Sequence, residues 1–240
     1  MKRSLFDPRP WRMWNLVWKK RGNTIHFTML IGLFFSIAMV IPYTITNRIT
    51  QFIGWTVFDP KLSIDESIPY IPLLNLAYIS YYAYYILIPF FARNETQQKC
   101  AIMFSQRLYI CTIPVFLIFL LLPVEVDLRI DVKGDDVLTS LLTLVHSVDQ
   151  PYNAWPSLHV THSLCVVLSV PLIFNLSKYA HVSLWVAWVL LTISTMTTQQ
   201  HYLFDVVTGM IYAVTVHQLF IRPVLSDCKA GAYDEAFQQT

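Results

Sequence analysis

The chain has 240 residues, of which 55% are hydrophobic and 13% are charged, and its mean hydropathy is +0.48. This composition indicates an integral membrane protein with room for one membrane domain. The formal net charge of +2 gives no reason to expect nucleic acid as a partner. The sequence therefore predicts that the protein lies in a membrane bilayer.

Residues 1–23 are basic and rich in tryptophan, and they lack the apolar core of a signal peptide. Trp11, Trp14 and Trp18 recur at helical spacing, which suits a short interfacial helix on an anionic leaflet. A positively charged flank before the first span explains the segment equally well. We expect residues 1–23 to form a cytoplasmic or interfacial segment.

Six apolar segments follow, and most of them approach the ~20 residues that cross the hydrocarbon core of a bilayer. They are approximately Thr24–Thr46, Ile68–Phe91, Met103–Val124, Ser157–Leu176, Ala180–Thr197 and His201–Ile221. A backbone in lipid must satisfy its own hydrogen bonds, and these unbroken runs have helical length. The sequence predicts an all-α polytopic membrane protein with six transmembrane helices in residues 24–222 and a cytoplasmic tail in residues 223–240.

The basic residues predict the orientation of these spans. Arg93, Arg107, Lys178, Arg222 and Lys229 fall on the same side of the predicted spans as the basic N-terminal segment, and the opposite loops are rich in aspartate and glutamate. Because basic loops stay in the cytoplasm, we expect both termini to be cytoplasmic.

The longest outer loop, residues 125–150, has a helical pattern of its own. Apolar side chains recur at helical spacing in Val137, Leu138, Leu141, Leu142 and Val145, and Asp135 and Asp136 precede them as possible caps. We expect a short amphipathic helix on the outer leaflet, either shaping lipid entry or only covering the helix ends.

Asn153-Ala154-Trp155-Pro156-Ser157-Leu158-His159-Val160 places polar side chains at the mouth of the fourth apolar segment. Pro156 suits the first turn of a helix, and Asn153 or Ser157 can cap its free amides. That helix end, beside Ser157 and His159, would be a site for a phosphate group.

Residues 194–209 place a second polar cluster at the sixth segment. His201 and Asp205 are four residues apart and would share a helical face, so the carboxylate could hold Nδ1 and leave Nε2 free as a base or nucleophile. Each histidine could instead be a merely satisfied polar residue. Two such clusters at matching helix ends favour a functional role.

Together, PSLH and S-T-x5-H-Y-x2-D resemble the second and third motifs of the type 2 phosphatidic acid phosphatase superfamily, the membrane relatives of vanadium haloperoxidases. The matching residues are Pro156, Ser157 and His159, then Ser194, His201 and Asp205. Thr195 occupies the position of the superfamily's arginine, and the first motif, K-x6-R-P, is absent. The S-T-x5-H-Y segment is similar to that of inositol-phosphoceramide synthases and related bacterial proteins. This resemblance implies a bacterial inner (plasma) membrane location.

The resemblance also implies roles for these residues. His201 would attack phosphorus and form a phosphohistidine, Asp205 would orient it, and His159 would protonate the leaving oxygen. Ser157 and Ser194 would bind the phosphoryl oxygens. Gln200 could hydrogen-bond a phosphate or a polar acceptor, or it could equally well face water. Neither a metal nor another cofactor is expected, because PSLH is not a metal-binding signature.

The missing arginine leaves the phosphoryl group without a cation. Arg129, after the third segment, is the best outer-side candidate, and Lys133 is the reserve. Arg129 could equally be a loop residue paired with Asp127 or Asp131.

These features predict a membrane lipid phosphatase that acts on a phosphorylated lipid at the outer leaflet. Two alternatives remain: a phosphotransferase of the inositol-phosphoceramide synthase type that passes a phospho-headgroup to an alcohol, and an inactive lipid-binding or transport protein. The His159, His201 and Asp205 set argues against the last.

Overall fold

The computed structural model describes residues 9–54, 56, 59–129, 137–148 and 150–238. Within these ranges the chain forms helices and no strand, as predicted. The first half contains α1 (Trp14–Trp18), α2 (Thr24–Phe35), α3 (Ile41–Ile53), α4 (Asn75–Ile79), α5 (Tyr81–Phe91) and α6 (Glu95–Leu121). The second half contains α7 (Val137–Val148), α8 (Leu158–Ile173), α9 (Lys178–Thr197), α10 (Leu203–Val216), α11 (Arg222–Lys229) and α12 (Asp234–Gln238).

Five helical stretches of the described chain are long and apolar enough to cross a membrane. They are Thr24–Ile53, Pro72–Phe91, Glu95–Leu121, Lys178–Thr197 and Leu203–Lys229. Each matches a predicted segment, so the expected all-α membrane fold is confirmed. The sixth, α8, has 16 residues and is shorter than a typical span. The count of six therefore stays a prediction.

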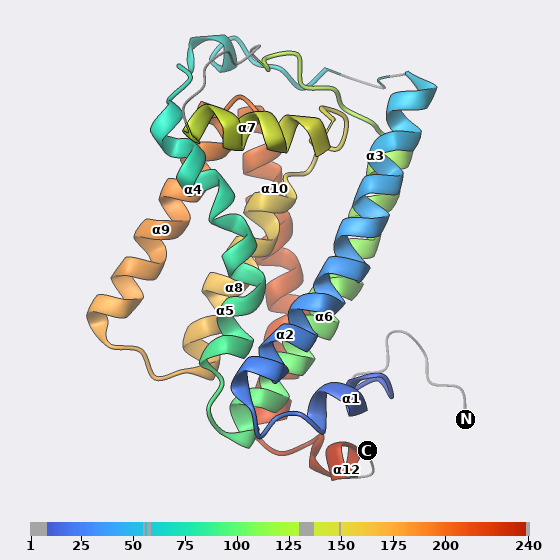
Figure 1. Cartoon of the computed structure of the whole chain (residues 1–240), viewed down its shortest axis with the longest axis vertical. Coiled ribbons are helices and arrows are strands. Elements are labelled where there is room, and N and C mark those ends of the chain that lie inside the picture. Colours follow the sequence, from blue (N-terminus) through green and yellow to red (C-terminus); the bar gives the residue numbers. More distant parts are fainter. Residues whose placement is uncertain (1–8, 55, 57–58, 130–136, 149, 239–240) are drawn as a thin grey trace.

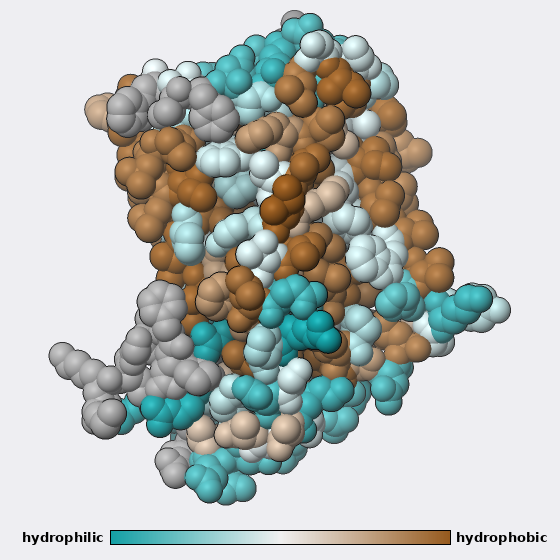
Figure 2. All heavy atoms as spheres, turned by 180° about the vertical axis from the view of Figure 1, so that it is seen from behind, coloured by the Kyte–Doolittle hydropathy of each residue, from teal (hydrophilic) through white to brown (hydrophobic). Residues whose placement is uncertain are grey.

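The long helices lie side by side, α7 lies across one end of the bundle, and α1 and α12 lie at the other end (Figure 1). Apolar side chains cover much of the flanks, whereas hydrophilic ones gather at the ends (Figure 2). Most residues of α8 are buried, because α5, α6, α9 and α10 surround it. The PSLH motif thus lies at the start of α8, the most enclosed helix of the bundle.

The N-terminal tryptophans pack against the bundle. Trp14 and Trp18 are buried, and the Trp14 indole Nε1–H donates to Oε1 of Gln106 in α6 at 2.9 Å. The ring of Trp18 lies 4.8 Å from that of Phe237 in α12. This segment therefore joins the two terminal regions, a role that the predicted interfacial helix or charged flank did not include.

The predicted outer helix is present as α7. Its suggested caps, Asp135 and Asp136, lie outside the described residues. The predicted boundary between residues 222 and 223 falls inside the helical stretch Leu203–Lys229. The division into three segments stays a prediction.

Candidate active site

The two motifs meet where the N-terminal ends of α8 and α10 touch. The Ser157 backbone N–H donates to the Asp205 backbone oxygen at 3.2 Å. The Thr161 hydroxyl is shared between the backbone oxygens of Ser157 and Gly209, at 2.8 and 3.2 Å. Gly209 permits this approach, since a Cβ atom there would lie 2.9 Å from the Ser157 oxygen. Residues far apart in the sequence are thus fixed at one place.

Both helices begin slightly later than predicted. Helix α8 begins at Leu158 with Ser157 at its N-cap, so Pro156 precedes the helix and is not in its first turn. Helix α10 begins at Leu203, so His201 lies in the preceding turn and does not share a helical face with Asp205. At α10 the later start follows from the Asp205 side chain, which caps the helix, whereas the Ser157 side chain makes no capping hydrogen bond at the start of α8.

His201 and Asp205 nevertheless lie close together, because Asp205 folds back to cap α10. Its Oδ2 accepts the Tyr202 backbone N–H at 2.9 Å and lies 3.6 Å from Nδ1 of His201. The Leu203 backbone N–H donates to Oδ1 of Asp65, 2.8 Å away. Two carboxylates therefore fix the start of α10 and the position of the histidine before it.

His159 completes a triad of ionisable groups. Its Nδ1 lies 3.4 Å from Nε2 of His201, and the rings meet edge to face. His201 is 5% exposed and Asp205 is fully buried. The structure therefore brings together the three residues to which the sequence assigned the chemistry.

Several polar atoms at this site are buried without a hydrogen-bond partner among the described residues, among them Ser157 Oγ, His201 Nδ1, Asp205 Oδ1 and Gln200 Oε1. Buried polar atoms are nearly always satisfied, so a cluster of exceptions indicates a site that completes its bonds with a ligand. The substrate-binding roles of Ser157 and Gln200 stay predictions.

A small cavity of about 10 Å³ adjoins His201, with room for about one water molecule. Its lining residues are Tyr43, Arg129, Gln150, Pro151, Asn153, Ala154, Gln200 and His201. Arg129 thus lines the same cavity as His201, and its predicted role as the phosphate-binding cation stays a prediction. Lys133 lies outside the described residues.

Tyr202 connects the segment before Arg129 to the turn that carries His201. Its hydroxyl donates to Oδ1 of Asp127 at 2.8 Å and accepts the Asp127 backbone N–H at 3.0 Å. Asp127 also pairs with Lys61 at 3.1 Å. These contacts, the tyrosine hydrogen bond first, lower the pKa of Asp127. Asp127 is thus bound to Lys61 and Tyr202, while the other suggested partner of Arg129, Asp131, lies outside the described residues.

His146 belongs to the site, although the sequence analysis did not select it. The Gln200 side-chain amide donates to Nε2 of His146 in α7 at 2.7 Å. Burial, assisted by the charge of Arg129, lowers the pKa of His146 from 6.5 to about 4. The apolar spacing of residues 137–145 predicted the helix, but no local signal indicated that this histidine would contact Gln200.

Ser194 and Thr195 face the protein interior. Both are fully buried, and their hydroxyls donate to the backbone oxygens of Leu191 and Thr192, at 2.6 and 2.8 Å. The Thr195 backbone oxygen accepts the backbone N–H groups of Gln200 and His201, each at 3.1 Å. This part of the motif shapes the turn that carries His201, and neither residue lines the cavity.

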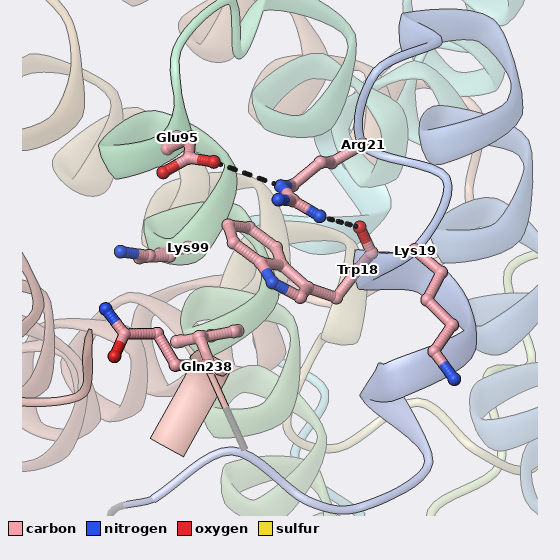
Figure 3. Close-up of a pocket in the computed structure, with 7 residues that line it drawn as sticks. Trp18, Lys19, Arg21, Glu95, Lys99 and Gln238 are labelled. Atoms are coloured by element: carbon pink, nitrogen blue, oxygen red, sulfur yellow. Dashed lines mark hydrogen bonds and ion pairs between the residues drawn. The ribbon is translucent and has the colours of Figure 1, made fainter. Parts of the chain in front are cut away.

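A larger cavity of about 270 Å³ lies at the opposite end of the bundle (Figure 3). It is lined by Trp18, Lys19, Arg21, Glu95, Lys99, Phe237 and Gln238. Arg21 pairs with Glu95 at 3.2 Å, and Lys99 pairs with Asp234 at 2.7 Å. These ion pairs join the terminal segments to α6.

The described residues contain no group of three or more histidine, cysteine or acidic side chains placed to hold a metal ion.

The fold and the site define an integral membrane protein of the class that acts on phosphoesters. The family model of the PAP2 superfamily matches residues 55–219, and the chain belongs to this superfamily. The match includes both motifs and Arg129. No curated protein and no solved structure matches the chain significantly.

Proposed function

We propose that the chain is a lipid phosphatase that hydrolyses a phosphorylated lipid at the outer leaflet through a phosphohistidine. The observation that carries this proposal is the position of His201, 3.4 Å from His159, 3.6 Å from Asp205 and on the wall of a cavity that it shares with Arg129. PAP2 superfamily membership supports chemistry of the phosphatase type.

In the first step Nε2 of His201 attacks phosphorus, and the bond from phosphorus to the lipid oxygen breaks. His159 gives its proton to that oxygen. Water then attacks phosphorus, the bond to Nε2 breaks, and His159 takes a proton from the water. Asp205 orients His201, while Arg129 and Ser157 offset the charge on the phosphoryl oxygens.

The resting site is too small for this reaction. The two imidazole nitrogens are 3.4 Å apart, which leaves no space between them for a phosphoryl group. The group must lie to one side, and the cavity lined by Arg129 and Gln200 is adjacent to Nε2 of His201. Because that cavity holds about one water molecule, a bound phosphoryl group would need more room beside His201 than this structure provides.

A phosphotransferase is the second candidate. Gln200 Oε1 has no hydrogen-bond partner among the described residues, and its amide holds His146. Gln200 and His146 form a polar pair beside the cavity, and such a pair suits an alcohol that replaces water in the second step. The unusual Thr195 also favours the branch that resembles inositol-phosphoceramide synthases.

Purified protein should be incubated with a panel of lipid phosphates and phosphoinositides, with and without alcohol acceptors, and the products identified by mass spectrometry. Free phosphate in all reactions supports the phosphatase, and transfer to an added alcohol supports the phosphotransferase. His201→Ala should abolish either activity, whereas His26→Ala, an exposed residue at the other end, should not. A His201→Ala protein that retains full turnover contradicts the proposal. If the wild-type protein binds lipid but turns over no substrate, the remaining interpretation is an inactive lipid-binding protein.

A further inference from the structure

His162 is buried within the bundle and has no role in the proposed chemistry. It lies in α8 one turn after His159 and is 1% exposed. Its Nδ1 lies 2.9 Å from the Tyr81 hydroxyl and 2.7 Å from the Tyr85 hydroxyl, and its Nε2 lies 2.9 Å from Oγ1 of Thr112. Polar groups inside a membrane domain are costly, so an intact network of four side chains from three helices calls for a function.

The hydrogen bonds define the tautomer of His162. The Thr112 hydroxyl has one proton, which it donates to the Leu108 backbone oxygen at 2.7 Å. Nε2 of His162 must therefore carry a proton and donate it to Thr112. Nδ1 is then an acceptor with a single lone pair, and the two tyrosine hydroxyls also hydrogen-bond to each other. One hydroxyl therefore donates to Nδ1, and the other donates to the first hydroxyl. The network fixes the hydroxyl end of Tyr81.

Tyr81 connects this network to the active site. Its ring centroid lies 4.3 Å from that of His159, and the ring of Tyr78 lies 4.5 Å from His159. Rings at such distances make favourable contacts and limit each other's rotation. The ring of Tyr85 packs against Phe35 at 4.9 Å and against Tyr81 at 5.1 Å, and among the described residues it makes no ring contact with His159.

We propose that His162 and Tyr81 are positioning residues for His159. His162 holds the Tyr81 hydroxyl, and the Tyr81 ring holds the His159 imidazole in the orientation from which it protonates the leaving oxygen. This assignment rests on the proposed function, since it deepens the role of His159. A network that only stabilises the packing of α5, α6 and α8 would have different consequences.

Tyr81→Phe and Tyr85→Phe form a matched pair for the test. Each removes one hydroxyl from the network and keeps the ring. In Tyr85→Phe the Tyr81 hydroxyl can still donate to Nδ1 of His162, which lies 2.9 Å away. An alkyl phosphate leaving group needs a proton, whereas an aryl phosphate leaving group needs it far less. We expect Tyr81→Phe to lower kcat on the alkyl substrate about three- to tenfold, with KM and the aryl rate nearly unchanged. Tyr85→Phe should change either rate at most about twofold.

Variants of His162 extend the test. His162→Asn keeps a polar group near the position of Nδ1 and should retain more of the alkyl rate than His162→Leu. The ratio of alkyl to aryl rates decides the matter, since a loss of folded protein lowers both equally. Equal losses on both substrates in Tyr81→Phe, or equal effects of Tyr81→Phe and Tyr85→Phe, overturn the positioning role.

A measurement without turnover separates this inference from the proposed function. Histidine labelled with ¹⁵N should give an altered His159 imidazole signal in Tyr81→Phe and an unaltered one in Tyr85→Phe. Absence of turnover on every substrate overturns the proposed function, and an unaltered His159 signal in Tyr81→Phe overturns the positioning of His159 by Tyr81.

Discussion

The backbone amide of Ser157 donates a hydrogen bond to the backbone oxygen of Asp205, 3.2 Å away. The two motifs are therefore joined from main chain to main chain. Replacing His159 or His201 removes neither of these two main-chain groups. Single substitutions of the ionisable residues should for this reason report on chemistry more than on folding.

His159→Ala should impair turnover according to the leaving group. We expect a large loss on an alkyl lipid phosphate and a smaller loss on an aryl phosphate, because only the alkoxide needs a proton from His159. Steady-state rates on both substrates test this expectation. Equal losses would contradict the role of His159 as general acid.

Gly209→Ala should separate the ends of α8 and α10. The new Cβ atom would lie 2.9 Å from the Ser157 backbone oxygen, which cannot move without shifting the helix. We expect a loss of about 1–3 kcal/mol in stability, together with reduced turnover. Gly32→Ala is the control, since its Cβ atom would make an ordinary contact of 3.5 Å with Ile86. Thermal unfolding and turnover of both variants provide the measurement, and a Gly209→Ala protein like the wild type would show that the helices can adjust.

Arg129→Ala should lower turnover about ten- to a hundredfold, because a charge-assisted hydrogen bond contributes roughly 1.5–3 kcal/mol. Arg129→Lys should recover part of the rate, since an ammonium lacks the planar two-point contact. Arg48→Ala, an exposed arginine bonded to Gln51, is the control. If Arg129→Ala is silent and Lys133→Ala is impaired, the lysine supplies the charge. Arginine at Thr195 should not rescue Arg129→Ala, because Thr195 is fully buried away from the cavity.

The hydrogen bond between His146 in α7 and the side chain of Gln200 should weaken in acid. Burial lowers the pKa of His146 to about 4 from 6.5, so between these values the unfolded chain binds more protons than the folded protein. The contribution of His146 to stability is therefore lost as the pH falls from 6.5 towards 4. Thermal midpoints across this range should decline less steeply for His146→Gln than for the wild type, whereas His26→Gln should follow the wild type. Identical slopes for His146→Gln and the wild type would show that His146 does not titrate in this window.

The outward orientation of the site is tested by labelling. A cysteine placed at Gln150 should react with a membrane-impermeant thiol reagent in intact cells, and one placed at Ser177 should not. The four natural cysteines are all buried, which keeps the background low. The reverse pattern would place the site on the cytoplasmic side.

The sequence by itself determined the membrane class, the position of the long helices and the two polar clusters. Apolar runs of sufficient length must become helices in lipid, whatever their neighbours, so their positions follow from composition. The spacing of His201 and Asp205 also predicted their proximity. It did so through the wrong local structure, because the carboxylate caps α10 and the histidine precedes it.

Only the tertiary structure decided which side chains from different helices share the site. It brought His146 to Gln200, placed Arg129 in the cavity beside His201 and buried Thr195 on the other side of the turn. Helical periodicity predicts which residues share a face of one helix, but not which neighbour that face meets. Those contacts depend on the packing of the whole bundle, including the close approach at Gly209 that joins the two motifs.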